Sequence, residues 1–167
     1  MCSKTAPSIM PVSALVASRM HTRLAASRAL IPRSPVEARF TLPAHEALVG
    51  CLRRAAGVVL SRWHLSDDEQ DSALLIVGEL AANAAVHGRS EMSLHMVLAE
   101  GTLGIVVGDH GEPAPTPRRP TGGDPDERGR GLDIVHALST RVDLHHGDHD
   151  TWILAHLAVT PGGPGAD

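Results

Sequence analysis

The chain has 167 residues, which suits one domain with a sizeable core, and its aromatic side chains are limited to Phe40, Trp63 and Trp152. The formal net charge of −4 is unevenly spread, because residues 1–36 carry five basic and no acidic side chains and the remainder carries the acidic excess. An acidic body with few rings offers neither a phosphate-neutralising surface nor stacking platforms for bases. A nucleic-acid-binding protein is therefore excluded.

The cysteines indicate the compartment. Cys2 and Cys51 are isolated and form neither a CxxC motif nor a disulfide framework, which is typical of a reducing environment. No stretch approaches the roughly 20 apolar residues that span a bilayer. We therefore expect a cytoplasmic protein that has no membrane segment.

The basic segment 1–36 precedes the folded domain, and we expect it to be a disordered leader. It could also be an upstream extension of a true start at Met10 or Met20. Within it, Ile9–Ala17 is the only hint of a secretory signal, and Pro11 interrupts its apolar run. The cytosolic interpretation explains the rest of the chain better.

The domain is expected over residues 37–160, with a tail at 161–167. Alternation over residues 39–42 predicts a short strand, and apolar periodicity predicts a helix over about 44–63. Ser66 and Glu69 form a capping-box pattern, which predicts a second helix that runs to His87 and stops at Gly88.

The second half of the domain predicts two hairpins and a short helix. Residues 92–98 and 103–107 are strand-like, with a turn at Glu100-Gly101, and the Pro- and Gly-rich stretch 110–128 has the length of a lid or a disordered loop. A helix is expected over 132–139, followed by strands at 141–145 and 151–159. Helices that interleave with antiparallel pairs predict an α/β fold, a two-layer mixed-sheet sandwich with the helices on one face.

The most informative feature is a polar stripe on the second helix. At 3.6 residues per turn, Glu79, Asn83 and His87 share one narrow face of an otherwise apolar helix. A core helix that keeps polar side chains must satisfy them, and an ion or ligand is one way to do so.

Two further clusters accompany the stripe. Asp109-His110-Gly111 follows an apolar strand, and Gly129-Arg130-Gly131-Leu132 opens a helix whose N-terminus would favour an anion. Taken singly, a DxG is most often a turn, a GxG a flexible joint, and an Asn within a helix a solvent-facing residue. Their order along the chain changes this interpretation.

The order resembles the nucleotide site of the GHKL family, the histidine-kinase-like ATPases, over roughly residues 40–160. The short single-domain form looks most like the anti-sigma-factor serine/threonine kinases and their actinobacterial relatives. The resemblance implies a Bergerat-type ATP-binding fold with ATP and Mg²⁺ as cofactors. The chain has no helical hairpin with a phosphoacceptor histidine, so a complete sensor kinase is not expected.

The resemblance also implies a role for each matching residue. Asn83 would coordinate Mg²⁺, Glu79 would be the general base, and Asp109 would accept a hydrogen bond from the adenine amino group. The remaining ATP-site residues would be the glycine beside the base, the phosphate loop with the leucine that follows it, the threonine that supports the aspartate, and a histidine of less defined role: Gly111, Gly129, Arg130, Gly131, Leu132, Thr151 and His87.

The chemistry of the residues agrees with these roles. Mg²⁺ needs only one or two protein oxygen ligands beside phosphate, so one Asn carbonyl is enough. Lys4 is the only lysine, so the positive charge must come from Arg130, helped by Arg128 or by Arg118 and Arg119 of the expected lid. A carboxylate at Glu79 could orient or deprotonate a serine hydroxyl.

Three functional hypotheses remain open. The first is an ATP- and Mg²⁺-dependent serine/threonine kinase that holds a sigma factor and phosphorylates an antagonist protein, in a partner-switching system. The second is a nucleotide-gated protein-binding module without phosphotransfer, and the third is a relative that binds no nucleotide. Relatives commonly form homodimers, so self-association is expected. The histidine-rich hairpin at His145, His146, Asp148 and His149 could hold a metal, but surface composition explains it more simply.

Overall fold

The computed structural model describes residues 35–87, 90–110, 130–147 and 150–160, all of which fall within one compact unit. The elements in chain order are β1 (Val36–Pro43), α2 (Glu46–Arg62), α3 (Asp67–His87), β2 (Glu91–Ala99), β3 (Thr102–His110), α4 (Arg130–Leu138), β4 (Arg141–His146) and β5 (Asp150–Ala158).

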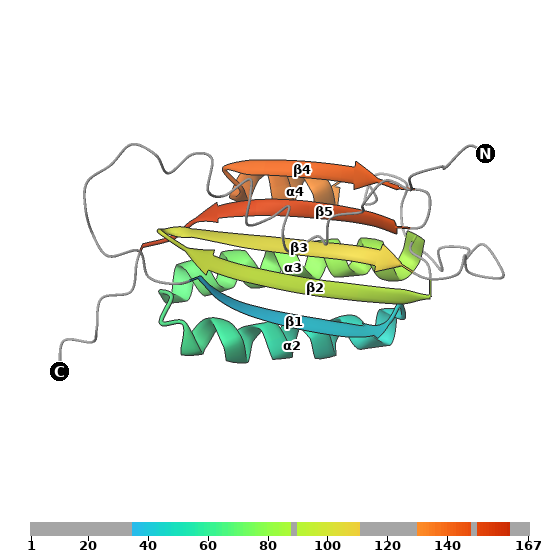
Figure 1. Ribbon diagram of the computed structural model, residues 1–167, viewed down its shortest axis with the longest axis horizontal. Helices are drawn as coiled ribbons and strands as arrows, with labels where there is room; N and C mark the ends of the chain where they lie inside the picture. Colours follow the sequence, from blue (N-terminus) through green and yellow to red (C-terminus); the bar gives the residue numbers. More distant parts are fainter. Residues whose placement is uncertain (1–34, 88–89, 111–129, 148–149, 161–167) are drawn as a thin grey trace, which may run out of the picture. The chain divides into compact units, whose positions relative to one another are not determined.

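The five strands form one sheet in the order β1-β2-β3-β5-β4, and the three helices cover one of its faces (Figure 1). The α/β class and the two-layer arrangement with one-sided helices are confirmed. The sheet itself differs from the mixed sheet that we expected, because each of its four pairings is antiparallel. Two hairpins, β2-β3 and β4-β5, supply two of these pairings directly.

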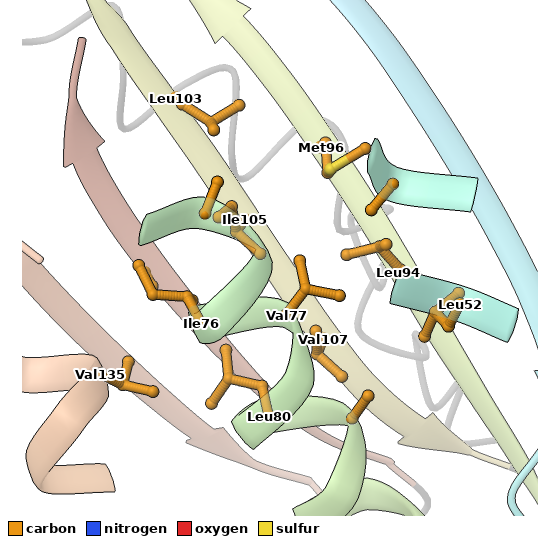
Figure 2. Packing of buried hydrophobic residues seen from close by; sticks show 14 of the residues in the cluster. Leu52, Ile76, Val77, Leu80, Leu94, Met96, Leu103, Ile105, Val107 and Val135 are labelled. Atoms are coloured by element: carbon orange, nitrogen blue, oxygen red, sulfur yellow. The ribbon is translucent and has the colours of Figure 1, made fainter. Parts of the chain in front are cut away.

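The core lies between α3 and the centre of the sheet (Figure 2). Ile76, Val77 and Leu80 of α3 are fully buried against Ile105 and Val107 of β3. The core is almost wholly aliphatic, as the shortage of aromatic residues requires. This packing fixes α3 relative to the sheet and therefore also fixes the polar stripe along α3.

The N-terminus of α3 has the predicted capping box. The Ser66 N–H donates to Glu69 Oε2 at 2.9 Å, and the Glu69 N–H donates to Ser66 Oγ at 3.4 Å. The other carboxylate oxygen of Glu69 accepts a hydrogen bond from the Thr160 N–H at 2.6 Å. Glu69 therefore joins the start of α3 to the end of β5, which no local sequence signal indicated.

The strands are longer than their apolar runs. β1 begins at Val36, three residues before the expected start at Arg39, because β2 offers a pairing partner to every residue of β1. Glu100 and Gly101 have φ values of 45° and 77°, which confirms the predicted hairpin turn.

β3 continues through Asp109 to His110. Asp109 was expected just after the strand, and this expectation is wrong, because pairing with β2 and β5 extends past the apolar residues.

Several expectations lie outside the described residues. They concern the leader up to residue 34, Gly88, the stretch 111–128 and the tail 161–167. Within the part of the chain that the structure describes, no helix is long and apolar enough to cross a membrane.

Candidate nucleotide site

The polar stripe of α3 lies beside the face of the helix that is buried in the core. Glu79 and Asn83 are half-buried, one helical turn apart, whereas their neighbours Leu80 and Ala84 belong to the core. His87 is the last residue of α3, and its side chain lies outside the described part of the structure. The predicted spacing of Glu79 and Asn83 on one face is therefore present.

The stripe meets the start of α4. A Cβ atom built on Gly131 would lie 2.7 Å from Glu79 Oε2, so the carboxylate is in contact with the backbone of the first turn of α4. α4 is held there by the fully buried Val135, which packs into the core beside α3. Arg130 and Leu132, which flank Gly131, are both exposed.

A second part of the site comes from the sheet. Asp109 of β3 pairs with Thr151 of β5, and both side chains are half-buried. By the alternation of β3, Asp109 is on the same face as Ile105 and Val107, which is the face that the helices cover. The carboxylate and the hydroxyl therefore point toward the helix layer.

The directions of α3 and β3 show how the two parts of the site lie relative to each other. In Figure 2, α3 and β3 run in the same sense, with Ile76 beside Ile105, and with Leu80 and Val107 both farther along. Asp109 is two residues beyond Val107, and Asn83 is about one turn beyond Leu80. The two polar groups therefore lie toward the same end of the helix-covered face.

Sequence reasoning did not assign two residues to this end of the sheet: Gly108 was not singled out, and His146 was considered only as a possible metal ligand. His146 of β4 reaches Thr151 with its Nδ1 atom 3.4 Å from Thr151 Oγ1, a contact set only by the register of the last hairpin. At Gly108, next to Asp109, a Cβ would fit only tightly, because it would lie 3.1 Å from both the Thr151 carbonyl oxygen and Trp152 Cβ. A glycine inside an otherwise apolar strand is a signal for such close approach.

The histidine-rich hairpin has a structural role where it is described. His145 stacks on Trp152, with ring centroids 4.8 Å apart, on the face of the sheet opposite to Thr151. Asp148 and His149 lie outside the described residues. Within the described ranges, no group of three or more His, Cys, Asp or Glu side chains is placed to hold a metal ion.

Other expected site residues also fall outside the described ranges. They are Gly111, Gly129 and the arginines of the expected lid, Arg118, Arg119 and Arg128. What the structure brings together is the Glu79 carboxylate with the first turn of α4, and Asp109 with Thr151. The side-chain oxygen of Asn83 is of the type that Mg²⁺ prefers, and a nucleotide would supply further ligands.

Comparisons with known proteins agree with this arrangement. No curated protein matches the sequence significantly. Among solved structures, the fold is similar to that of the RsbU and RsbW domains of Rv1364c from Mycobacterium tuberculosis, with a TM-score of 0.58 and 18% sequence identity. The match covers 74% of this chain but only 32% of the solved chain, so this chain spans about a third of the length of that protein.

A family comparison covers most of the domain. The sequence model for the histidine kinase-like ATPase domain matches residues 42–157, a range that includes both parts of the candidate site. The chain therefore belongs to the histidine kinase-like ATPase family, the family that the polar stripe and the glycine motifs resemble.

Proposed function

We propose that this chain binds ATP with Mg²⁺ and transfers the terminal phosphoryl group to a serine or threonine of a partner protein. The observation that carries this proposal is the contact between the Glu79 carboxylate and the start of α4 at Gly131, one helical turn from Asn83. A carboxylate and an amide are thereby assembled beside a helix N-terminus, where phosphate groups bind favourably.

The residues fit a nucleotide in the following way. The Asp109 carboxylate, supported by Thr151, would accept a hydrogen bond from the adenine amino group, and the family resemblance adds Gly111 as the glycine beside the base. Asn83 would supply the protein ligand to Mg²⁺, which would neutralise phosphate charge when bound. Because Gly131 has no side chain, the Glu79 carboxylate reaches the backbone of the first turn of α4. Arg130 is the cation nearest to this turn in sequence, and its exposed side chain is free to reach a phosphate.

The remaining family positions complete the proposal on sequence grounds. Gly129 and Leu132 flank the phosphate-binding turn, and His87 ends the helix that carries the stripe. Glu79 orients the acceptor hydroxyl and receives its proton. Phosphoryl transfer depends mainly on such positioning and on charge neutralisation, so these few groups are sufficient.

The partners that we propose are a sigma factor and an antagonist protein that competes for it. The support is the family and the similarity in fold to a protein with an RsbW domain. In this scheme the chain holds the sigma factor, and phosphorylation of the antagonist prevents release. We also propose a homodimer in the cytoplasm.

The test is phosphoryl transfer from Mg-ATP to candidate antagonists, compared between the native chain and Glu79→Gln. The kinase proposal expects transfer by the native chain, a loss of about 100-fold or more in Glu79→Gln, and similar nucleotide affinity for both. Calorimetry with Mg-ATP comes first, since absence of binding would remove both the kinase and the nucleotide-gated alternative. Binding without transfer to any antagonist that the chain binds would leave the binding module as the function.

A further inference from the structure

We infer that Gly131 is a positioning residue for Glu79: its missing side chain allows the Glu79 carboxylate to stand against the first turn of α4. This inference depends on the proposed function only for the catalytic role of Glu79. The contact itself is a property of the nucleotide-free chain.

The space that a side chain at position 131 would need is occupied by the side chain of Glu79. Of the heavy atoms within 4 Å of a Cβ built on Gly131, the three nearest are Oε2, Cδ and Cβ of Glu79, at 2.7, 3.7 and 3.8 Å. A separation below 3.0 Å is one that real Cβ atoms essentially never show, so a methyl group at position 131 requires a displacement.

The backbone gives no other reason for a glycine here. Among the described glycines only Gly101 has a positive φ, so the conformation at Gly131 is open to any L-residue. Position 131 is the second residue of a nine-residue helix, where alanine would be favoured over glycine. Helix propensity alone would therefore favour alanine at position 131, but the Glu79 carboxylate occupies the space that the alanine methyl group would need.

The carboxylate, and not the helix, is expected to yield to a methyl group. α4 is anchored by Val135, which is fully buried, whereas Oε2 is the far end of a flexible side chain that is only half-buried. A rotation of the Glu79 side chain costs little free energy of folding. It would nevertheless move the carboxylate away from the position in which it faces the start of α4, and a misplacement of about 1 Å can reduce a catalytic rate about 100-fold.

The test compares Gly131→Ala with Gly50→Ala. Gly50 lies in α2, and a Cβ built there would have only the Arg54 Nη1 atom, at 3.6 Å, in ordinary contact, so the control makes the same chemical change without a collision. We expect Gly131→Ala to keep a melting temperature close to that of the control, while kcat for transfer falls about 100-fold. In a Glu79→Gln background, Gly131→Ala should cause no further loss.

A readout without catalysis separates this inference from the proposed function. With ¹³C-labelled glutamate, the carboxyl resonance of Glu79, assigned through Glu79→Gln, should shift in nucleotide-free Gly131→Ala and not in Gly50→Ala. If the native chain has no transferase activity, the proposed function fails while this resonance still decides the inference. An unmoved resonance overturns it.

If Gly131→Ala proves unstable, a double variant decides. Glu79→Ala leaves only the Cβ of residue 79, at an ordinary distance of 3.8 Å, so Glu79→Ala/Gly131→Ala should regain the melting temperature of Glu79→Ala. Failure to regain it would show that the methyl group collides with something other than this carboxylate, and would overturn the inference.

Discussion

Asp109 of β3 lies directly opposite Thr151 of β5, and both side chains point from the sheet toward the helix layer. A charged acceptor and a hydroxyl are thereby fixed side by side on rigid strands and not on a loop. Because strand positions are held by the sheet ladder, the pair can present a constant hydrogen-bonding edge to a flat ligand such as a nucleobase.

This pairing predicts that Asp109→Asn weakens nucleotide binding. The amide keeps the shape of the side chain but loses the charged acceptor, and hydrogen bonds to charged groups contribute about 1.5–3 kcal/mol. We expect the affinity for Mg-ATP, measured by calorimetry, to fall about 10- to 100-fold. Asp150→Asn is the control, since it makes the same charge change one residue from Thr151 on the opposite face of β5. Equal losses in the two variants would contradict a role for Asp109 in recognising the base.

Gly108→Ala should destabilise the sheet. Its Cβ would lie 3.1 Å from the Thr151 carbonyl oxygen, which belongs to the backbone of a central strand and cannot yield easily. We expect a loss of about 1–3 kcal/mol in the free energy of unfolding, measured by urea denaturation. Gly57→Ala is the control, because its nearest contacts are ordinary ones with the Leu74 side chain at 3.8 Å, and it should gain stability from helix propensity. A Gly108→Ala variant as stable as the control would show that β3 and β5 can separate at this point without cost.

Much of this architecture was predictable because its signals are local. The capping box of Ser66 and Glu69, the hairpin turn at Glu100-Gly101 and the stripe of Glu79 and Asn83 each depend on residues within one or two turns of chain. Such patterns specify elements and faces regardless of the remainder of the protein.

What the sequence could not supply depends on packing between distant segments. The contact between Glu79 and Gly131 joins residues on two separate helices, and the hydrogen bond from Thr160 to Glu69 joins the segment after β5 to the start of α3. Asp109 lies within β3 because of pairing with β2 and β5, although the apolar run ends at Val107. The residue at which a strand ends depends on the strands with which it pairs, and the residue pattern of one strand alone does not contain that information.

Glu69 should make the stability of the domain sensitive to acid. Burial raises the pKa of the Glu69 carboxyl, but hydrogen bonds donated by the N–H groups of Thr160 and Ser66 outweigh this effect, and the net pKa is below the ordinary value of 4.5. The stabilisation is therefore complete above pH 4.5 and is lost as the pH falls through the lower pKa of the folded state.

Glu69→Gln tests this linkage. The variant should be less stable than the native chain near neutral pH, and the difference between them in urea denaturation should narrow on acidification. Glu46→Gln, in the first turn of α2, is the control for the charge change alone. A native-to-variant difference that stays constant down to about pH 3 would contradict the role of the ionised carboxylate.

His95 should add a second pH dependence at higher pH. The side chain is 8% exposed on β2, and its Nε2 atom lies 2.9 Å from Glu37 Oε2 on the edge strand β1. Burial lowers the pKa of His95, and this effect outweighs the opposing hydrogen bond to Glu37, so the net pKa is below the ordinary 6.5. The neighbouring Arg39 also lowers the pKa, and the pKa of Glu37 is itself lowered, first by the hydrogen bond with His95.

The sign of the effect follows from proton binding. Below pH 6.5 the unfolded chain protonates His95 more readily than the folded chain does, so the domain loses stability as the pH falls from 6.5 toward the lower folded-state pKa. His95→Gln keeps a donor for Glu37 but cannot take up a proton, and it should therefore lose less stability than the native chain between about pH 7.5 and about pH 5.5. His136→Gln, at an exposed position of α4, should behave like the native chain. Urea denaturation at the two pH values measures all three proteins, and a native-like loss in His95→Gln would assign the pH dependence to other histidines.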